Sequence, residues 1–272
     1  MPQHVRSVAD TDPVWTRVRQ DAHALTEEEP ALASFLLAAV LNHSRLDDVL
    51  CRHLAQKLAN QEVSATLLQQ VFDEAMSADA DIGVACRADI VAVYNRDPAC
   101  TNYLEPIIYF KGFHALQSYR VAHWLWQKDR RPMALYLQNR ISEVFAVDIH
   151  PAAQIGRGIM VDHATGLVIG ETAVVEDEVS MLHGVTLGGT GKQTGDRHPK
   201  VRRGSLIAAG AKILGNIEIG ECARIGAGSV VLEDTPAHST AVGVPAKVVQ
   251  RGEKHEPAQE MDHMICCEDW QI

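Results

Sequence analysis

The sequence lacks the signals of several large protein classes. It has no CxxC pair to hold zinc, and its six cysteines show no framework spacing, so we expect reduced cysteines in a cytoplasmic protein. It has no basic block, and 25 Lys and Arg against 35 Asp and Glu give a net charge of −10, which disfavours a nucleic-acid partner. The N-terminus has no apolar segment typical of a signal peptide, and the longest apolar run, 35–41, is far too short to cross a bilayer.

The chain does contain a six-residue repeat, which extends from 149 to about 249. Large apolar residues recur at a step of six in three blocks, 149–161, 169–187 and 201–231. Glycine often follows the apolar residue, and the fifth position is usually small or β-branched. A hexapeptide period is typical of a parallel β-helix, in which short strands form flat sides and one apolar residue in six points into the shaft. We therefore expect residues 146–250 to form a β-helix.

Residues 1–145 show helical spacing instead. An aspartate–proline pair at 12–13 is a helix start signal, and a second such pair at 97–98 is a stop signal. Apolar residues recur every three or four positions between them, and two further helices are expected at 113–128 and 133–145. We predict an all-α domain with a role in packing or assembly. Because no flexible linker follows it, we expect it to pack against the β-helix.

The last segment, 251–272, is expected to be a mobile acidic tail. Residues 253–272 contain six acids and one lysine, and they end on Trp270-Gln271-Ile272. An aromatic and an aliphatic residue at the tip of an acidic tail are typical of a docking peptide, although chance also explains this composition.

Two interruptions of the repeat indicate the functional site. The step is eight between 161 and 169 and fourteen between 187 and 201. Insertions in a solenoid form loops on one face, often the binding face. The first interruption holds His163 beside an acid, and the second holds an arginine–histidine pair at 197–198. The glycine-rich stretch 188–192 lacks the spacing of a phosphate-binding loop, which argues against a nucleoside-triphosphate site.

Four segments resemble the bacterial serine O-acetyltransferases: 95–99, 147–166, 185–200 and 208–220. The resemblance spans essentially the whole chain and includes a helical N-terminal half, a left-handed hexapeptide β-helix and a free C-terminal isoleucine. It implies transfer of acetyl from acetyl-CoA to the hydroxyl of L-serine, giving O-acetylserine and CoA in cysteine biosynthesis. Acetyl-CoA would be a co-substrate, with no permanently bound cofactor and no metal.

The resemblance implies that His163 is the catalytic base and Asp148 its partner acid. A serine hydroxyl is a poor nucleophile at neutral pH, and histidine, with an ordinary pKa near 6.5, suits its deprotonation. A neighbouring acid would fix the tautomer and stabilise the imidazolium. The structural alternatives are a histidine that caps a coil and an acid at a satisfied corner. With Cys222 inside the repeat and no acyl-enzyme cysteine evident, we expect direct transfer in a ternary complex.

The substrate is a zwitterion, so both of its charges need partners. The resemblance assigns its carboxylate to Arg197, a two-pronged donor, and its ammonium group to Asp97 and Asp162, with His198 beside it. The alternatives are a solvated loop charge, a helix-stop acid and a simple turn. Because Asp97 belongs to the helical half, the site would lie where that half meets the β-helix, within one subunit or between two.

The resemblance also implies a CoA site of small and basic residues. Small residues would let the pantetheine arm approach the backbone, and basic residues would meet its phosphates. These residues are Gly189, Ala209, Ala227, Lys212, Arg224 and Lys247. The alternatives are solvated lysines and glycines that the turns require.

The resemblance further implies an assembly and a partner. β-Helices of the family form trimers with the acyl donor between shafts, and the helical halves join two trimers into a hexamer. The terminal isoleucine, here Ile272, enters the active site of O-acetylserine sulfhydrylase, a pyridoxal-phosphate enzyme. L-Cysteine inhibits members of the family by occupying the serine site.

Three other functions remain open from the residues. A γ-type carbonic anhydrase would use histidines such as His150, His163, His183 and His198 for zinc, but no H-x-x-x-x-H spacing is present. A different small acceptor, such as a sugar, would have no use for paired opposite charges. A non-catalytic scaffold would display the tail and cleave no thioester.

Overall fold

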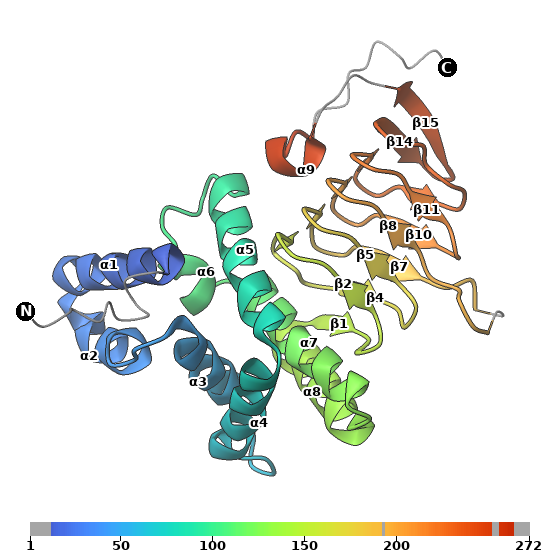
Figure 1. Ribbon diagram of the computed structural model, residues 1–272. Coiled ribbons are helices and arrows are strands. Elements are labelled where there is room, and N and C mark those ends of the chain that lie inside the picture. The colour runs from blue at the N-terminus through green and yellow to red at the C-terminus, as the bar shows by residue number, and fades with distance from the viewer. Residues whose placement is uncertain (1–11, 192–193, 252–255, 264–272) are drawn as a thin grey trace, which may run out of the picture.

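The structure, a computed structural model, describes residues 12–191, 194–251 and 256–263. A helical half packs beside one end of a β-helix, which rises away from it toward the C-terminus (Figure 1). This arrangement confirms the predicted fold class, a helical N-terminal half followed by a parallel β-helix of hexapeptide repeats. None of the helices in the described ranges is long and apolar enough to cross a membrane.

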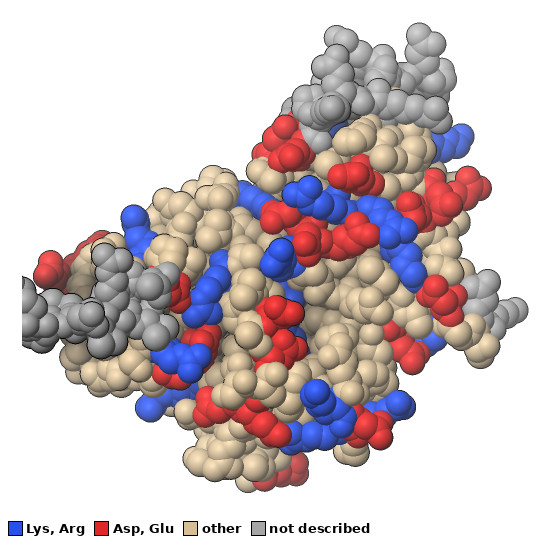
Figure 2. Space-filling model, in the orientation of Figure 1, with Lys and Arg blue, Asp and Glu red and all other residues tan. Residues whose placement is uncertain are grey.

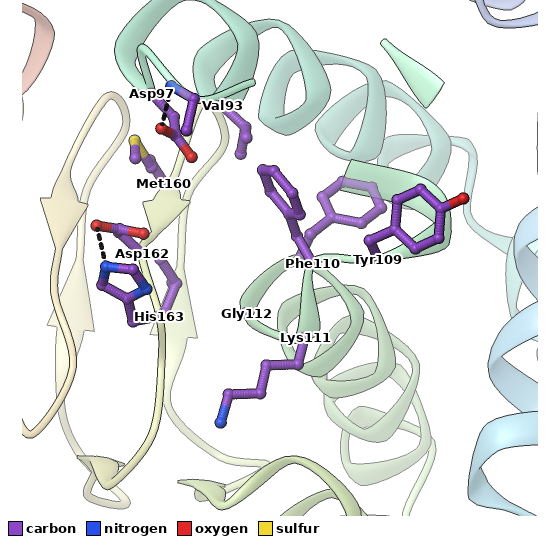
Figure 3. A pocket seen from close by; sticks show the side chains of 12 residues that line it. Val93, Asp97, Tyr109, Phe110, Lys111, Gly112, Met160, Asp162 and His163 are labelled. Atoms are coloured by element: carbon purple, nitrogen blue, oxygen red, sulfur yellow. Dashed lines mark hydrogen bonds and ion pairs between the residues drawn. The ribbon is translucent and has the colours of Figure 1, made fainter. Parts of the chain in front are cut away.

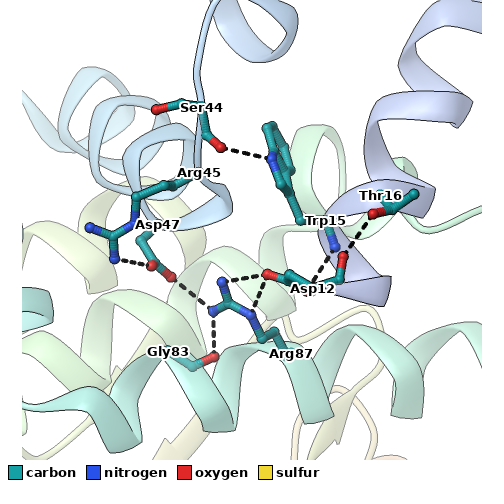
Figure 4. A network of polar contacts seen from close by, with 8 residues as sticks. All are labelled: Asp12, Trp15, Thr16, Ser44, Arg45, Asp47, Gly83 and Arg87. Carbon is teal, nitrogen blue, oxygen red and sulfur yellow. Dashed lines mark hydrogen bonds and ion pairs between the residues drawn. The ribbon is translucent and has the colours of Figure 1, made fainter. Parts of the chain in front are cut away.

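The helical half contains α1 (Pro13–Glu28), α2 (Ala33–Leu36), α3 (Leu46–Leu58), α4 (Ala65–Ala78), α5 (Ala80–Arg96), α6 (Leu104–Ile108), α7 (Lys111–Gln127) and α8 (Arg131–Phe145), with a 3-10 turn η2 (Pro30–Leu32) and a π-helical turn η3 (Leu37–Leu41) beside α2. The predicted start of α1 is confirmed, because Asp12 Oδ1 accepts from Trp15 N at 3.0 Å and proline follows. Arg87 of α5 binds both Asp12 and Asp47, each at 2.8 Å (Figure 4), so one guanidinium holds the starts of α1 and α3 against α5.

The shaft contains β1 (Val147–Ile149), β2 (Gln154–Ile155), β3 (Met160–Val161), β4 (Leu167–Ile169), β5 (Val174–Val175), β6 (Ser180–Met181), β7 (Thr186–Gly188), β8 (Lys200–Val201), β9 (Leu206–Ile207), β10 (Lys212–Leu214), β11 (Glu218–Ile219), β12 (Arg224–Ile225), β13 (Val230–Val231), β14 (Ser239–Gly243) and β15 (Ala246–Arg251). In the described part of the chain these form three sheets, with orders β1-β4-β7-β10-β13, β11-β8-β5-β2 and β15-β14-β12-β9-β6-β3.

The register explains the six-residue spacing. Ile149 pairs with Ile169, and Ile169 pairs with Leu187, so apolar residues of successive coils stack inside the shaft. All three are at most 2% exposed. Among the described strands, β15 alone runs antiparallel, against β14, where the repeat ends.

The charged side chains of the shaft lie mostly outside its core. Acidic and basic residues are interspersed on the face in Figure 2, and no broad patch of one sign covers the described part of that face. Arg202, for example, binds Glu176 at 2.7 Å and also pairs with Glu218, so residues of successive coils neutralise one another.

Part of the segment expected to be a mobile tail is packed. Helix α9 (Pro257–Glu260) lies against α5 and the shaft, and Ala258 within it is fully buried. Ser180 Oγ donates to Ala258 O at 2.8 Å. The burial of Ala258 and this hydrogen bond hold the segment in place, whereas Ile272 lies outside the described residues.

Candidate active site

A pocket of about 310 Å³ lies where the helical half meets the shaft (Figure 3). The acidic and imidazole side chains that line it come from both halves: Asp97 at the end of α5, and Asp162 and His163 in the first interruption of the repeat. Aromatic residues Tyr109, Phe110 and Phe113, from the end of α6 to the start of α7, line the other side. We call the shaft edge between β3 and β4, together with this pocket, the pocket edge.

His163 is held outward by a left-handed corner. Both His163 and Ala164 have positive φ, +56° and +60°, and Ala164 is fully buried beneath the corner. The His163 side chain is 72% exposed, and its Nε2 lies 3.6 Å from Asp162 Oδ2. The two extra residues of the interruption therefore place an accessible imidazole beside a carboxylate.

Asp97 ends α5 and also lines the pocket. Its Oδ1 accepts from Ala99 N at 2.8 Å, which is the helix-stop role that its sequence context also predicted. The second carboxylate oxygen makes no hydrogen bond within the described residues. The pocket thus combines two carboxylates with an exposed imidazole, a combination able to bind an ammonium group and to accept a proton from a neighbouring hydroxyl.

Gly112 is a pocket residue that sequence reasoning missed. A Cβ at this position would lie 2.1 Å from Val161 O and 3.2 Å from the Cβ of Ala164. Only glycine lets the start of α7 approach the end of β3 this closely. A lone glycine in a helical pattern gives little sequence signal of such a contact.

Asp148 lies on β1, paired in register with Val168. It is half-buried, and its Oδ1 accepts from Gln138 Nε2 at 2.7 Å. Within the described residues, Asp148 and His163 form neither a hydrogen bond nor an ion pair with each other.

Arg197 and His198 lie on a different edge of the shaft, in the loop 189–199 between β7 and β8, which we call the loop edge. Arg197 Nη2 binds Glu171 Oε2 at 2.8 Å, and this hydrogen bond lowers the pKa of the Glu171 carboxyl. His198 is 7% exposed, with Nδ1 2.9 Å from Thr172 Oγ1. Burial, and then the charge of Arg197, lower the pKa of His198.

The pocket edge and the loop edge flank the same sheet, the one that contains β4 and β7. Among the described residues, those that line the pocket include neither Arg197 nor His198. One chain therefore brings together Asp97, Asp162 and His163, and holds the other two predicted substrate ligands elsewhere.

The small residues predicted for CoA also divide between the edges. On the pocket edge, Gly210 N donates to His183 O at 2.9 Å and Gly228 N donates to Ala209 O at 2.8 Å. This ladder places Ala209 and the exposed Ala227 in successive coils beyond His183, as a row of small side chains. Gly189 lies on the loop edge.

The basic residues predicted for CoA differ in their contacts. Lys212 Nζ donates to Gly184 O and, at 3.1 Å, to Thr186 Oγ1. Arg224 Nη1 donates to Asp262 O at 3.0 Å, so the packed C-terminal segment contacts it. Lys247 is exposed on β15.

Comparison with known proteins gives the chain its family. Residues 14–118 match the family "Serine acetyltransferase, N-terminal", and residues 198–233 match "Bacterial transferase hexapeptide (six repeats)". The serine acetyltransferase of Salmonella typhimurium is 55% identical over 249 residues, which cover 92% of this chain and 91% of that protein.

Two solved structures share the whole architecture. A serine acetyltransferase in complex with cysteine has a TM-score of 0.92 at 53% identity, covering 93% of this chain and 98% of that one. The Brucella abortus serine acetyltransferase in complex with coenzyme A has a TM-score of 0.88 at 51% identity, covering 91% and 99%. With relatives this similar over nearly its full length, the chain belongs to the serine acetyltransferase family.

Proposed function

We propose that this chain transfers acetyl from acetyl-CoA to the hydroxyl of L-serine, with His163 as the general base. The observation that carries the proposal is the pocket at which an exposed imidazole lies among carboxylates from both halves of the molecule. The serine acetyltransferases that resemble this chain over nearly its full length support this activity over that of a carbonic anhydrase.

In the proposed step, a ring nitrogen of His163 takes the proton of the serine hydroxyl as the oxygen attacks the thioester carbonyl carbon. The tetrahedral intermediate then collapses, the carbon–sulfur bond breaks, and the imidazolium returns its proton to the CoA thiolate. General-base assistance of this kind contributes about 10²–10⁴-fold in rate. Asp97 and Asp162 would hold the serine ammonium group near this imidazole.

Arg197 and His198 would complete the site from a neighbouring chain. The serine carboxylate needs a cationic partner, and the pocket edge of one chain does not contain Arg197 among its described lining residues. If shafts associate as trimers, the loop edge of one can lie beside the pocket edge of the next, because both edges flank one sheet. Arg197 would then leave or share Glu171 to bind the carboxylate as a two-pronged donor.

Asp148 is proposed as the acid that orients His163 during turnover. Its carboxylate now accepts from Gln138. Catalytic hydrogen bonds are often long or absent before substrate binds and tighten in the complex. If His163 and Asp148 form this bond during turnover, Asp148→Asn should lower turnover without weakening CoA binding.

Acetyl-CoA would bind between neighbouring shafts as a co-substrate. The row of small residues at Ala209 and Ala227 offers space for an extended pantetheine arm, and Gly189 would face it from the adjacent loop edge. Exposed Lys247 is the best placed of the basic residues for a phosphate, whereas Lys212 and Arg224 would first exchange their present contacts. The solved relative with coenzyme A supports a CoA site in this fold.

L-Cysteine is proposed as an inhibitor at the serine site. It carries the same two charged groups as serine and differs only at the nucleophilic atom, so the same carboxylates and arginine would bind it. A related structure holds cysteine, which supports the proposal.

The C-terminal isoleucine is proposed to dock into O-acetylserine sulfhydrylase, and two trimers are proposed to join through their helical halves. Deleting Ile272 should abolish co-elution with the sulfhydrylase without changing acetyl transfer. Unchanged co-elution would refute the docking role.

The general-base role is tested by His163→Ala. We expect turnover to fall by about 10²–10⁴-fold, measured as thioester loss from acetyl-CoA, while the affinity for CoA stays unchanged. His23→Ala is the matched control, because His23 is exposed on α1, far along the chain from the pocket residues. Wild-type turnover by His163→Ala would refute the assignment.

A further inference from the structure

The position of Asp97 in the pocket depends on the end of α5. Asp97 is the residue directly after that helix, and its carboxylate is held only by Ala99 N among the described contacts. Local bonding to its own turn does not fix the distance from Asp97 to Asp162 on the shaft. Some other contact must hold the end of α5 against the shaft.

Val93 and Cys100 pack on Met160, and Asp89 accepts from Ile159 N, but Arg96, the last residue of α5, makes the polar contact next to Asp97. Its side chain is only 3% exposed, although it is charged. Nη1 donates to Gly158 O at 2.9 Å and to Ser180 Oγ at 3.2 Å, and Nη2 pairs with Glu178. A single guanidinium therefore binds three acceptors on two successive coils.

These acceptors are on the coils that also build the pocket. Gly158 comes two residues before Met160, which begins β3, and Ser180 pairs in register with Met160. Asp162 follows β3 directly. Arg96 directly precedes Asp97, and its side chain binds the coils that lead to Asp162. It therefore links the two carboxylates of the pocket.

A buried ion pair is a poor source of stability, because desolvation offsets most of the attraction. An apolar side chain would fill the same space at less cost. A planar guanidinium instead fixes geometry, because its N–H donors point in set directions and match only one arrangement of acceptors.

We propose that Arg96 is a positioning residue of the serine site, which sets the separation of Asp97 and Asp162 for the substrate ammonium group. This inference rests on the proposed function, because it takes Asp97 to bind that group. Displacing a substrate-binding group by about 1 Å can cost up to about 10²-fold in rate. Arg96 touches no substrate and acts through the helix end alone.

Arg96→Lys is the test, because lysine keeps the charge and loses the fork. We expect the KM for serine to rise by about 10- to 100-fold, with the KM for acetyl-CoA unchanged. The second readout is the inhibition constant of 3-hydroxypropionate, which has the carboxylate and hydroxyl of serine and lacks the ammonium group. We expect that constant to change by less than about threefold, because Asp97 has nothing to bind in this compound.

Two comparison variants make the outcome specific. Arg87→Lys alters another arginine of α5, which binds Asp12 and Asp47 instead of the shaft (Figure 4), and it should leave both constants unchanged. Glu178→Gln keeps an acceptor oxygen for Arg96 but removes the negative charge of residue 178. It should therefore raise the serine KM less than Arg96→Lys does. If Arg96→Lys does not fold, Glu178→Gln tests the positioning role in its place.

Asp97→Asn distinguishes failure of the positioning role of Arg96 from failure of the proposed contact between Asp97 and the ammonium group. If Asp97→Asn raises the serine KM selectively and both Arg96→Lys and Glu178→Gln leave it at the wild-type value, the positioning role is refuted and the proposed site stands. If Asp97→Asn itself leaves the serine KM unchanged, the ammonium contact fails and the positioning role fails with it. An equal rise for serine and 3-hydroxypropionate in Arg96→Lys would show a general structural defect and would also refute the inference.

Discussion

The pocket edge and the loop edge of the shaft differ in charge and in construction. The pocket edge presents Asp97, Asp162 and an exposed His163, and it needs the helical half to complete it. The loop edge presents Arg197 and a buried His198, and the described contacts of both residues are within the shaft. The acids that suit an ammonium group and the arginine that suits a carboxylate are therefore on separate edges.

This difference shows how a solenoid can divide a site. A regular shaft repeats the same three edges in every coil, so an irregular feature on one edge does not meet a feature on another. Association of shafts would bring unlike edges together without any change within either chain. The proposed serine site uses that geometry.

Apart from removal of the proposed base, the largest effect is expected from closing the pocket edge. Gly112→Ala puts a Cβ within 2.1 Å of Val161 O, so the start of α7 must move away from β3. The aromatic residues that line the pocket beside Gly112 would move with it. We expect kcat/KM for serine to fall by at least about 100-fold. The control is Gly83→Ala in α5, whose Cβ would have the side-chain ends of Arg87 and Asp47 as its nearest neighbours, at 3.2 Å. Near-wild-type activity of Gly112→Ala would show that this close approach does not matter.

A smaller and selective effect is expected at the loop edge. Arg197→Ala removes the proposed carboxylate partner, and hydrogen bonds to charged groups contribute about 1.5–3 kcal/mol. We expect the serine KM to rise by roughly 10- to 100-fold, while the inhibition constant of ethanolamine, which lacks the carboxylate, stays unchanged. A parallel rise for ethanolamine would contradict the assignment of Arg197 to the carboxylate.

The third prediction concerns stability in acid rather than activity, and the effect should act on the helices that support the pocket edge. Burial lowers the pKa of His53 to about 4 and that of His114, on α7, to about 3. In the unfolded chain both imidazoles take up protons near pH 6.5, whereas in the folded chain they stay neutral until much lower pH. The free energy of unfolding should therefore fall as pH falls below 6.5, by about 1.4 kcal/mol per unit for each histidine.

Urea unfolding at about pH 7 and about pH 5 measures this dependence. His53→Leu should make it shallower, because one of the two buried imidazoles is gone. The same pH dependence in His53→Leu as in the wild type would refute the role of the buried pair.

The shaft could be predicted residue by residue, whereas the pocket could be predicted only in part. Ile149, Ile169 and Leu187 follow from the repeat because each coil must bury one apolar residue per side. His163 and Arg197 follow from its two interruptions, with their roles implied by the resemblance.

The rest of the pocket edge depends on contacts that no period encodes. Gly112 and Arg96 look ordinary in a helical pattern, and their roles arise only when α5 and α7 pack against β3. Likewise, Ala258 of α9 is buried against the rest of the molecule, and the acidic composition of the tail gave no sign of this packing.

The division of the site between chains is tested most directly by complementation. His163→Ala disables the pocket edge and Arg197→Ala the loop edge, so each protein alone should be nearly inactive at limiting serine. Among all the oligomers formed on equal co-expression, about one quarter of the interfaces would pair an intact pocket edge with an intact loop edge, if subunits associate at random in a ring. We predict recovery of roughly that fraction of wild-type activity. Mixed oligomers no more active than either variant alone would contradict a site shared between chains.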